Sequence, residues 1–365
     1  MLSPERETAI VTAAREQATT EALEQAKAQV FNQSIAILPF ANASGDAGND
    51  YLSAGLSDEL RDRLAQVPGM RVMARSSSIR IQEQGMDVTD IAEQFGASRV
   101  IEGRFNRQGN RVMLSVQLID TLSSFQVWSH TFDRAIGDLL LLQEDLAAAA
   151  TAQLKPELVQ QAKPWVPSVQ QVSAHDLLLL GRQYEQQVTD QQLVDESKLQ
   201  KAIDYYRQTV EVDPNFAEAQ ARLGKMLLYL GDIEAAEAPI FKALELNPRL
   251  SDAHATLGLY YWTTRQPGIG AAYQRAIELN PNNADALSYY ASWLWLQGDV
   301  GGSANYYRLA RDVDPASLVR FAELGYLVAF QGNTQEAAEI ITHILQFFPT
   351  VPGYLAAARI AEANG

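Results

Sequence analysis

Short apolar runs and one four-residue periodicity organise positions 34–155. The run at 34–40 is typical of a buried strand, and a Gly/Asn/Asp-rich loop follows at 41–50. Leucines recur every fourth residue at Leu52, Leu56, Leu60 and Leu64, which predicts an amphipathic helix over 50–66. Four further strands are expected at 70–74, 99–105, 111–119 and 125–132, and two further helices at 87–95 and 136–154. This order predicts an α/β domain over 34–155, with helices packed on a mixed sheet.

The segments on either side of this domain have a different pattern. Residues 3–30 favour a helix, because Ser3 can cap it and Pro4 suits its first position. Its apolar positions are mostly alanine, which favours a solvated spacer over a weak dimerising coiled coil. We assign 1–33 to this N-terminal helix, whose pairing would give a homodimer. Prolines among polar residues predict a linker at 156–172.

From residue 173 onward the sequence repeats. Prolines that end helices are spaced by 34, 33, 34 and 34 residues, at Pro214, Pro248, Pro281, Pro315 and Pro349. Ten residues after each of the first four prolines stands a small residue where two antiparallel helices can touch, at Gly224, Gly258, Ala291 and Gly325. Gly181 holds this place in the first repeat. The pattern resembles the tetratricopeptide repeat (TPR). The resemblance implies an all-α superhelix over 173–365, with about five repeats, a terminal helix and a concave groove.

Several segments of the first half carry a second resemblance. They are Ser-Ile-Ala-Ile-Leu-Pro-Phe at 34–40, Tyr-Leu-Ser-Ala-Gly-Leu-Ser-Asp-Glu-Leu at 51–60, Val-Ile-Glu-Gly-Arg at 100–104 and Val-Trp-Ser-His-Thr-Phe-Asp at 127–133. Together they resemble the TolB amino-terminal-like (FlgO-like) α/β domain over about 33–155. In bacterial signalling proteins such a domain often precedes TPRs and follows one membrane span. A winged-helix DNA-binding domain or a class III adenylate cyclase stands upstream of that span.

The resemblance implies the sensory region of a membrane-anchored protein, on the periplasmic or extracytoplasmic side. Attachment to the membrane is expected only through an upstream span, with residues 1–33 as the juxtamembrane helix. The favoured full-length protein is a one-component transcription regulator. The extracytoplasmic region of an adenylate cyclase and a free-standing TPR scaffold for cell-envelope assembly are the alternatives.

Composition narrows the choice of partners. The formal net charge is −15 and the isoelectric point about 4.8, so the chain repels phosphate backbones and direct nucleic-acid binding is not expected. The absence of cysteine excludes disulfides, thiolate catalysis and cysteine-ligated zinc. No apolar run approaches the roughly 18 residues of a membrane span.

No catalytic, cofactor or metal site is expected, so the chain is predicted not to be an enzyme. The four histidines are far apart in sequence, and no phosphate loop or nucleophile elbow occurs. The stretch from Arg75 to Ser78 is interpreted as an ordinary polar connection, in preference to an anion site. The acidic pair Asp58 and Glu59 is expected on a solvated helix surface.

The concave groove is the candidate site for a protein or peptide partner. Large aromatic residues on one surface can anchor an extended peptide or a helix, although Trp262 and Trp295 could instead pack between repeats. The basic clamp of chaperone-binding TPRs is not evident. Carrying the family's groove positions onto this register selects Lys225, Tyr229, Asp252, Trp262, Asp285, Ser292, Trp295, Tyr326 and Phe330.

Overall fold

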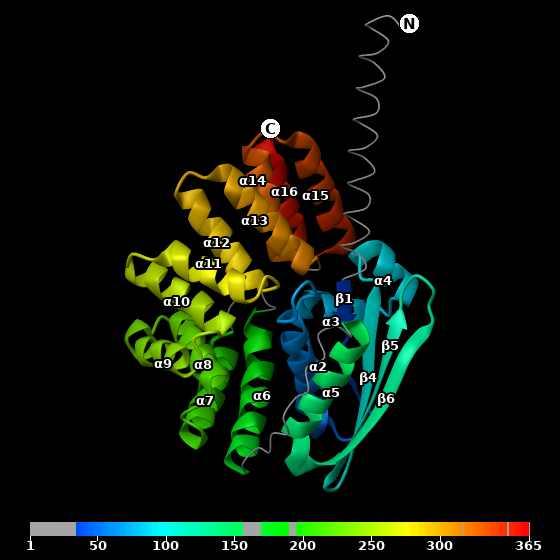
Figure 1. The fold of residues 1–365 in the computed structure, drawn as a ribbon. Helices are drawn as coiled ribbons and strands as arrows, with labels where there is room; N and C mark the ends of the chain where they lie inside the picture. Colours follow the sequence, from blue (N-terminus) through cyan, green and yellow to red (C-terminus); the bar gives the residue numbers. More distant parts are fainter. Residues whose placement is uncertain (1–33, 156–168, 190–194, 316, 349, 365) are drawn as a thin grey trace, which may run out of the picture.

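A computed structural model describes residues 34–155, 169–189, 195–315, 317–348 and 350–364 (Figure 1). The predicted N-terminal helix, with its possible dimer contact, lies outside these residues, as does the predicted linker over 156–168. Helix α6 (Val169–Thr189) already covers the last four positions assigned to the linker.

One six-stranded mixed sheet forms the first half of the molecule, which confirms the predicted fold class of this half. Its main path runs in the order β3-β1-β4-β5-β6. Strands β3, β1 and β4 are parallel, β2 also pairs with β4 in parallel, and β4, β5 and β6 are antiparallel. The bounds are β1 Ser34–Ile37, β2 Ala41–Asn42, β3 Arg71–Val72, β4 Arg99–Gln108, β5 Arg111–Asp120 and β6 Gln126–Ala135.

Helices cover both faces of this sheet. Helix α2 (Asp50–Ala65) buries the predicted leucine stripe against one face, together with α5 (Leu139–Leu154). Helix α4 (Val88–Phe95) covers the other face beside α3 (Arg75–Glu83), which was not predicted. Hydrophobic periodicity did not indicate α3, because the helix is short and three serines follow Arg75 in its first turn. Ser77, Ser78 and Ile81 are nevertheless buried. Short 3-10 turns, η1 (Ala47–Asn49) and η2 (Ile136–Asp138), precede α2 and α5.

In the second half, the regular elements of the described residues are all helices, which agrees with the predicted TPR superhelix. Small residues allow the close helix contacts that the repeat requires. A Cβ atom at Gly258, for example, would lie 2.4 Å from the ring of Tyr273. After α6 the helices are α7 Glu196–Val212, α8 Ala217–Leu230, α9 Ile233–Leu246, α10 Ser251–Thr264, α11 Ile269–Leu279, α12 Ala284–Leu296, α13 Val300–Val313, α14 Leu318–Phe330, α15 Thr334–Phe347 and α16 Val351–Asn364.

The solenoid curves around the α/β domain (Figure 1). At its beginning, α6 lies along α2, where Gly55 leaves room for the side chain of Leu179. Farther along, the backbone N–H of Ala74 donates to the carbonyl of Val313 at 2.8 Å. The Arg80 guanidinium lies 4.1 Å from the ring centroid of Phe348. The α/β domain therefore occupies part of the concave side of its own repeats.

Candidate partner-binding groove

Four inner helices, α8, α10, α12 and α14, present two rows of side chains to the concave side. The period of 33 or 34 residues places equivalent positions in register from helix to helix. The first row is made of carboxylates, here named the acidic band: Glu218, Asp252 and Asp285, each the second residue of its helix, and Glu323, which lies farther along α14. Toward the helix ends lies a row of aromatic side chains, here named the aromatic band: Tyr229, Trp262, Trp295, Tyr326 and Phe330.

The acidic band is part of an ion network that joins the two halves of the molecule. On α6, Arg182 pairs with Glu59 of α2 at 2.8 Å and with Glu218 of α8 at 3.3 Å, and it also pairs with Asp62 of α2. Lys225 pairs with Glu185 at 3.0 Å and with Asp285 at 3.3 Å. Among the described residues, the ion pairs that connect to Arg182 without passing through Glu59 join six carboxylates with four cations: Asp62, Glu185, Glu218, Asp252, Asp285 and Glu323 with Arg182, Arg222, Lys225 and Arg320.

Charges in this network shift the pKa values of its carboxyl groups in opposite directions. Burial favours the neutral form of Glu185, but Lys225 and Arg222 outweigh it and hold the pKa of Glu185 well below its ordinary value. Glu59 behaves oppositely, because burial and the neighbouring Glu218 raise its pKa to about 7. Individual carboxylates of the network thus differ in how fully their charge is compensated.

The prediction that Asp58 and Glu59 are solvated is wrong. Their exposed fractions are 3% and 9%, because this face of α2 is covered by the solenoid and by α3. Asp58 forms an ion pair with Arg61, accepts from Arg75 Nε at 3.1 Å and accepts from Gln186 Nε2 of α6 at 2.6 Å. Burial opposes ionisation, but Arg75 and Arg61 lower the pKa of Asp58 to about 2.

The start of α3 binds a carboxylate of the solenoid. The hydroxyls of Ser76 and Ser77 donate to Asp314, which follows α13, and the Ser77 contact is 3.0 Å long. The stretch after Arg75 was interpreted as an ordinary connection. It is instead a helix N-terminus that holds an anion supplied by the chain itself.

One asparagine of the solenoid forms hydrogen bonds with backbone groups at the β3 edge of the sheet. The side-chain amide of Asn282, just before α12, donates to the carbonyls of Ala65 and Met70 at 3.1 and 3.0 Å. Its oxygen accepts from the backbone N–H of Val72 on edge strand β3 at 3.3 Å. One side chain thus satisfies three backbone groups of the α/β domain.

Five of the nine predicted groove residues make polar contacts within the chain. Besides Lys225 and Asp285, which also pairs with Arg320 at 2.6 Å, they are Tyr229, Asp252 and Ser292. The Tyr229 hydroxyl lies 2.6 Å from that of Tyr289, and Asp252 accepts from Asn283 at 3.0 Å. The Ser292 hydroxyl donates to the Ser288 carbonyl at 2.9 Å and lies 2.8 Å from the Tyr307 hydroxyl.

The other four predicted residues, all aromatic, form the more open part of the groove. Trp262 is half-buried against neighbouring tyrosines, so packing between repeats accounts for part of its surface. Trp295 contacts Phe330, with ring centroids 5.2 Å apart. Tyr326 and Phe330 are 50% and 65% exposed, and Leu296 beside Trp295 is 65% exposed. The α/β domain therefore contacts the acidic side of the groove and leaves much of the aromatic band open.

Arg182 was not among the predicted groove residues, although its position in the repeat identifies it as one. Arg182 follows Gly181 as Lys225 follows Gly224, so it holds the same groove position one repeat earlier. Asn282 gave no such signal, because Asn215 occupies the equivalent place after Pro214 and is exposed.

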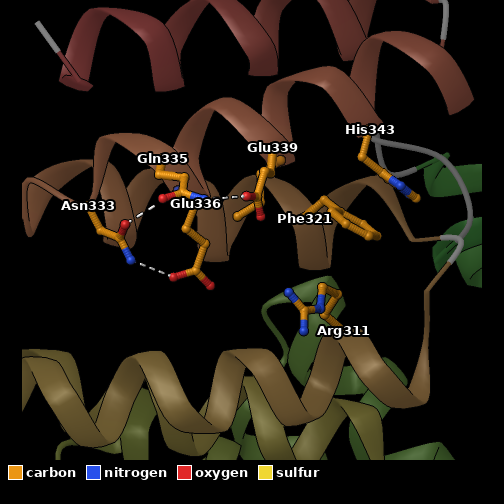
Figure 2. Close-up of a pocket in the computed structure, with 8 residues that line it drawn as sticks. Arg311, Phe321, Asn333, Gln335, Glu336, Glu339 and His343 are labelled. Carbon is orange, nitrogen blue, oxygen red and sulfur yellow. Dashed lines mark hydrogen bonds between the residues drawn. The ribbon is translucent and has the colours of Figure 1, made fainter. Parts of the chain in front are cut away.

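A second concavity lies between α13, α14 and α15, with a volume of about 490 Å³ (Figure 2). Its charged groups are engaged with neighbouring side chains: Glu336 pairs with Arg308 at 2.6 Å, and Arg311 pairs with Asp312 at 2.7 Å. His343 stacks on Phe321 at 3.9 Å, and burial lowers its pKa to about 4. The groove is therefore the stronger candidate.

Comparison with known proteins agrees with this two-part architecture. Residues 31–149 match the second domain of HilA/YgeH-like transcriptional regulators, and residues 191–252 and 255–317 match the tetratricopeptide repeat. The chain thus combines a stretch similar to the second domain of HilA-like regulators with TPRs that follow it. It is 28% identical over 197 residues to the protein named putative adenylate cyclase 3 of Rhizobium meliloti (strain 1021). That match covers 53% of this chain and 32% of the relative, so the chain spans about a third of its length.

Solved structures that resemble the chain include TPR proteins. A thermophilic TPR protein of Thermus thermophilus is 18% identical, with a TM-score of 0.43, over 52% of this chain and 98% of its own. PilF of Pseudomonas aeruginosa is 16% identical, with a TM-score of 0.40, over 60% of this chain and 91% of its own. Among the described residues, no helix is long and apolar enough to cross a membrane.

Proposed function

We propose that this chain is the non-enzymatic sensory and partner-binding region of a membrane-anchored bacterial signalling protein. It lies on the periplasmic or extracytoplasmic side and binds a protein or peptide in the open part of the TPR groove. The observation that supports the proposal is that the α/β domain covers only one part of the concave face of the solenoid. The α/β domain is held against the acidic band, and aromatic side chains remain exposed beside it.

The similarity of the first domain to transcriptional regulators supports a signalling role. The favoured full-length protein is a transcription regulator. The likeness to a protein named as an adenylate cyclase supports cyclase control as a second candidate. Both candidates assign the same task to this region, which is to detect a partner and pass the event to an output domain.

The groove offers a physical route from a partner to the α/β domain. Trp295 and Phe330 lie near the ends of α12 and α14, where a partner would bind. The beginnings of the same two helices hold the α/β domain or its ion network, through Asn282 and Arg320. A partner that shifts either helix therefore changes contacts at the α/β domain, which is a direct mechanical coupling.

Site-specific photo-crosslinking in living cells tests the location. A photoreactive phenylalanine analogue at position 330 should crosslink to a partner, because Phe330 is 65% exposed in the groove. The same analogue at Phe241, 43% exposed on outer helix α9, is the matched control. A crosslink at 330 that is lost in a folded Trp295→Ala variant supports the groove. Equal crosslinks at both positions, or one at 241 alone, would place the partner elsewhere.

A reporter assay tests the sensory role. The Trp295→Ala and Tyr326→Ala variants should alter the output of the full-length protein without lowering its amount in the membrane fraction. Output that is unchanged while the crosslink at 330 is lost would separate partner binding from signalling.

A further inference from the structure

The acidic band presents carboxylates to solvent and keeps its cations underneath. The side chains of Asp252 and Asp285 are 45% and 42% exposed, whereas those of Arg222 and Lys225 are 13% and 19% exposed. Asp62, contributed by α2 of the α/β domain, is 45% exposed in the same network. The most exposed charges of the network are therefore carboxylates, whereas its four cations are at most 19% exposed, so the charge accessible to a partner is negative.

The aromatic band runs parallel to this negative surface. Asp252 and Trp262 lie on α10, ten residues apart, and Asp285 and Trp295 have the same separation on α12. At a rise of about 1.5 Å per residue, the two bands are roughly 15 Å apart along the helices. An extended peptide laid between them points alternate side chains toward opposite bands. Tryptophan also attracts cations over its ring face.

We infer that the open groove binds an extended peptide in which lysine or arginine residues alternate with apolar ones. The basic side chains contact Asp252 and Asp285, and the apolar ones contact Trp295 and Phe330. An acidic segment is repelled by the band and by a chain of net charge −15. This inference rests on the proposed function, which places a partner in the groove, and adds the partner's chemistry.

Fluorescence anisotropy with the whole chain tests the inference. The probe is a short labelled peptide of alternating arginine and leucine. The comparison peptides alternate glutamate and leucine, or carry the arginines and leucines in two blocks. The alternating basic peptide should bind most tightly, and its affinity should fall as salt is added. Tighter binding of the glutamate peptide, equal binding of the block peptide, or no binding would overturn the inference.

Matched variants separate the groove from general charge attraction. Asp252→Asn with Asp285→Asn should weaken binding about tenfold, since it removes two ion-pair partners. Asp204→Asn with Glu245→Gln makes the same charge change on outer helices α7 and α9 and should leave affinity unchanged. Equal losses in both pairs would overturn the inference. If loss of the Arg320 contact unfolds the first pair, Asp252→Asn alone and Phe330→Ala replace it, each with a smaller loss expected.

Failure of the inference is distinguishable from failure of the proposed function. A partner segment crosslinked at position 330 that lacks basic residues overturns the peptide chemistry and leaves the groove as the site. Absence of a crosslink at 330, with crosslinks elsewhere, removes the proposed site itself.

Discussion

Replacing Asn282 with alanine should loosen the solenoid from the α/β domain without unfolding either part. The side chain makes three hydrogen bonds to backbone groups, at 3.0, 3.1 and 3.3 Å. Each hydrogen bond contributes about 1 kcal/mol net, and water can reach this half-buried site after truncation. The expected loss of contact free energy is therefore about 1–3 kcal/mol.

Hydrogen exchange at the backbone amide of Ala74 can report the opening of this contact, because Asn282 does not bond to that amide. The Ala74 N–H donates to the Val313 carbonyl across the same contact, at 2.8 Å. If the contact opens as a unit, Ala74 should exchange faster by about tenfold for each 1.4 kcal/mol lost. Amides of the central strand β4 should keep their protection, because their partners lie within the sheet.

Asn215→Ala is the matched control, because Asn215 holds the equivalent place after Pro214 and is exposed. It should leave exchange at Ala74 unchanged. Unchanged exchange at Ala74 in the Asn282 variant would refute the view that this side chain holds the two parts together. An equal effect of the Asn215 variant would show that the turn, and not the contact, is responsible.

Three further substitutions test the packing and the buried charges. Gly258→Ala should lower the free energy of unfolding by about 1–3 kcal/mol in denaturant titration, because its methyl group meets the Tyr273 ring; no loss would mean that the ring moves freely. Asp58→Asn should lower the free energy of unfolding by about 3–5 kcal/mol, because Arg61 is left buried without its charge partner. A loss under about 1 kcal/mol would contradict a buried ion pair. Burial lowers the pKa of His175 to about 4, so the unfolded state binds more protons between about pH 6.5 and 4, and stability falls as the pH falls through that window. His175→Gln should reduce the loss of Tm between pH 7 and 4.5, and an unchanged loss would assign the pH dependence to other groups.

Most of the fold follows from local pattern, and the exceptions have physical causes. The leucine stripe of α2 and the alternation of β5 identify their elements, since each repeats at the period of its structure. The proline spacing of 33 or 34 residues likewise predicted the solenoid, since the helices of successive repeats end at equivalent positions. Helix α3 was not predicted because two of its buried residues, Ser77 and Ser78, are polar and so add nothing to a hydrophobic pattern.

The repeat pattern predicts which residues line the groove, but it does not predict which of them pair within the chain. Periodicity selects which side chains face the concave side, because equal positions recur in every repeat. It cannot show that Arg182 meets Glu59, or that Gln186 meets Asp58, since the partners are 123 and 128 positions apart and belong to different domains. Long-range pairing of this kind follows from how the domains dock, which no local pattern encodes.

The docked α/β domain changes what a groove residue can do. In an open solenoid, Lys225 and Asp285 would both be available to a partner, whereas here they pair with each other and with Glu185 and Arg320. A basic partner at Asp285 therefore competes with Lys225 and Arg320, which are already in place. Burial raises the pKa of Asp314, whose carboxylate accepts from Ser76 and Ser77, and Arg320 opposes that rise, so the proposed competition would be felt at the start of α3. If a partner binds in the groove as proposed, these shared charges would link its binding to the docking of the α/β domain, and each would alter the free energy of the other.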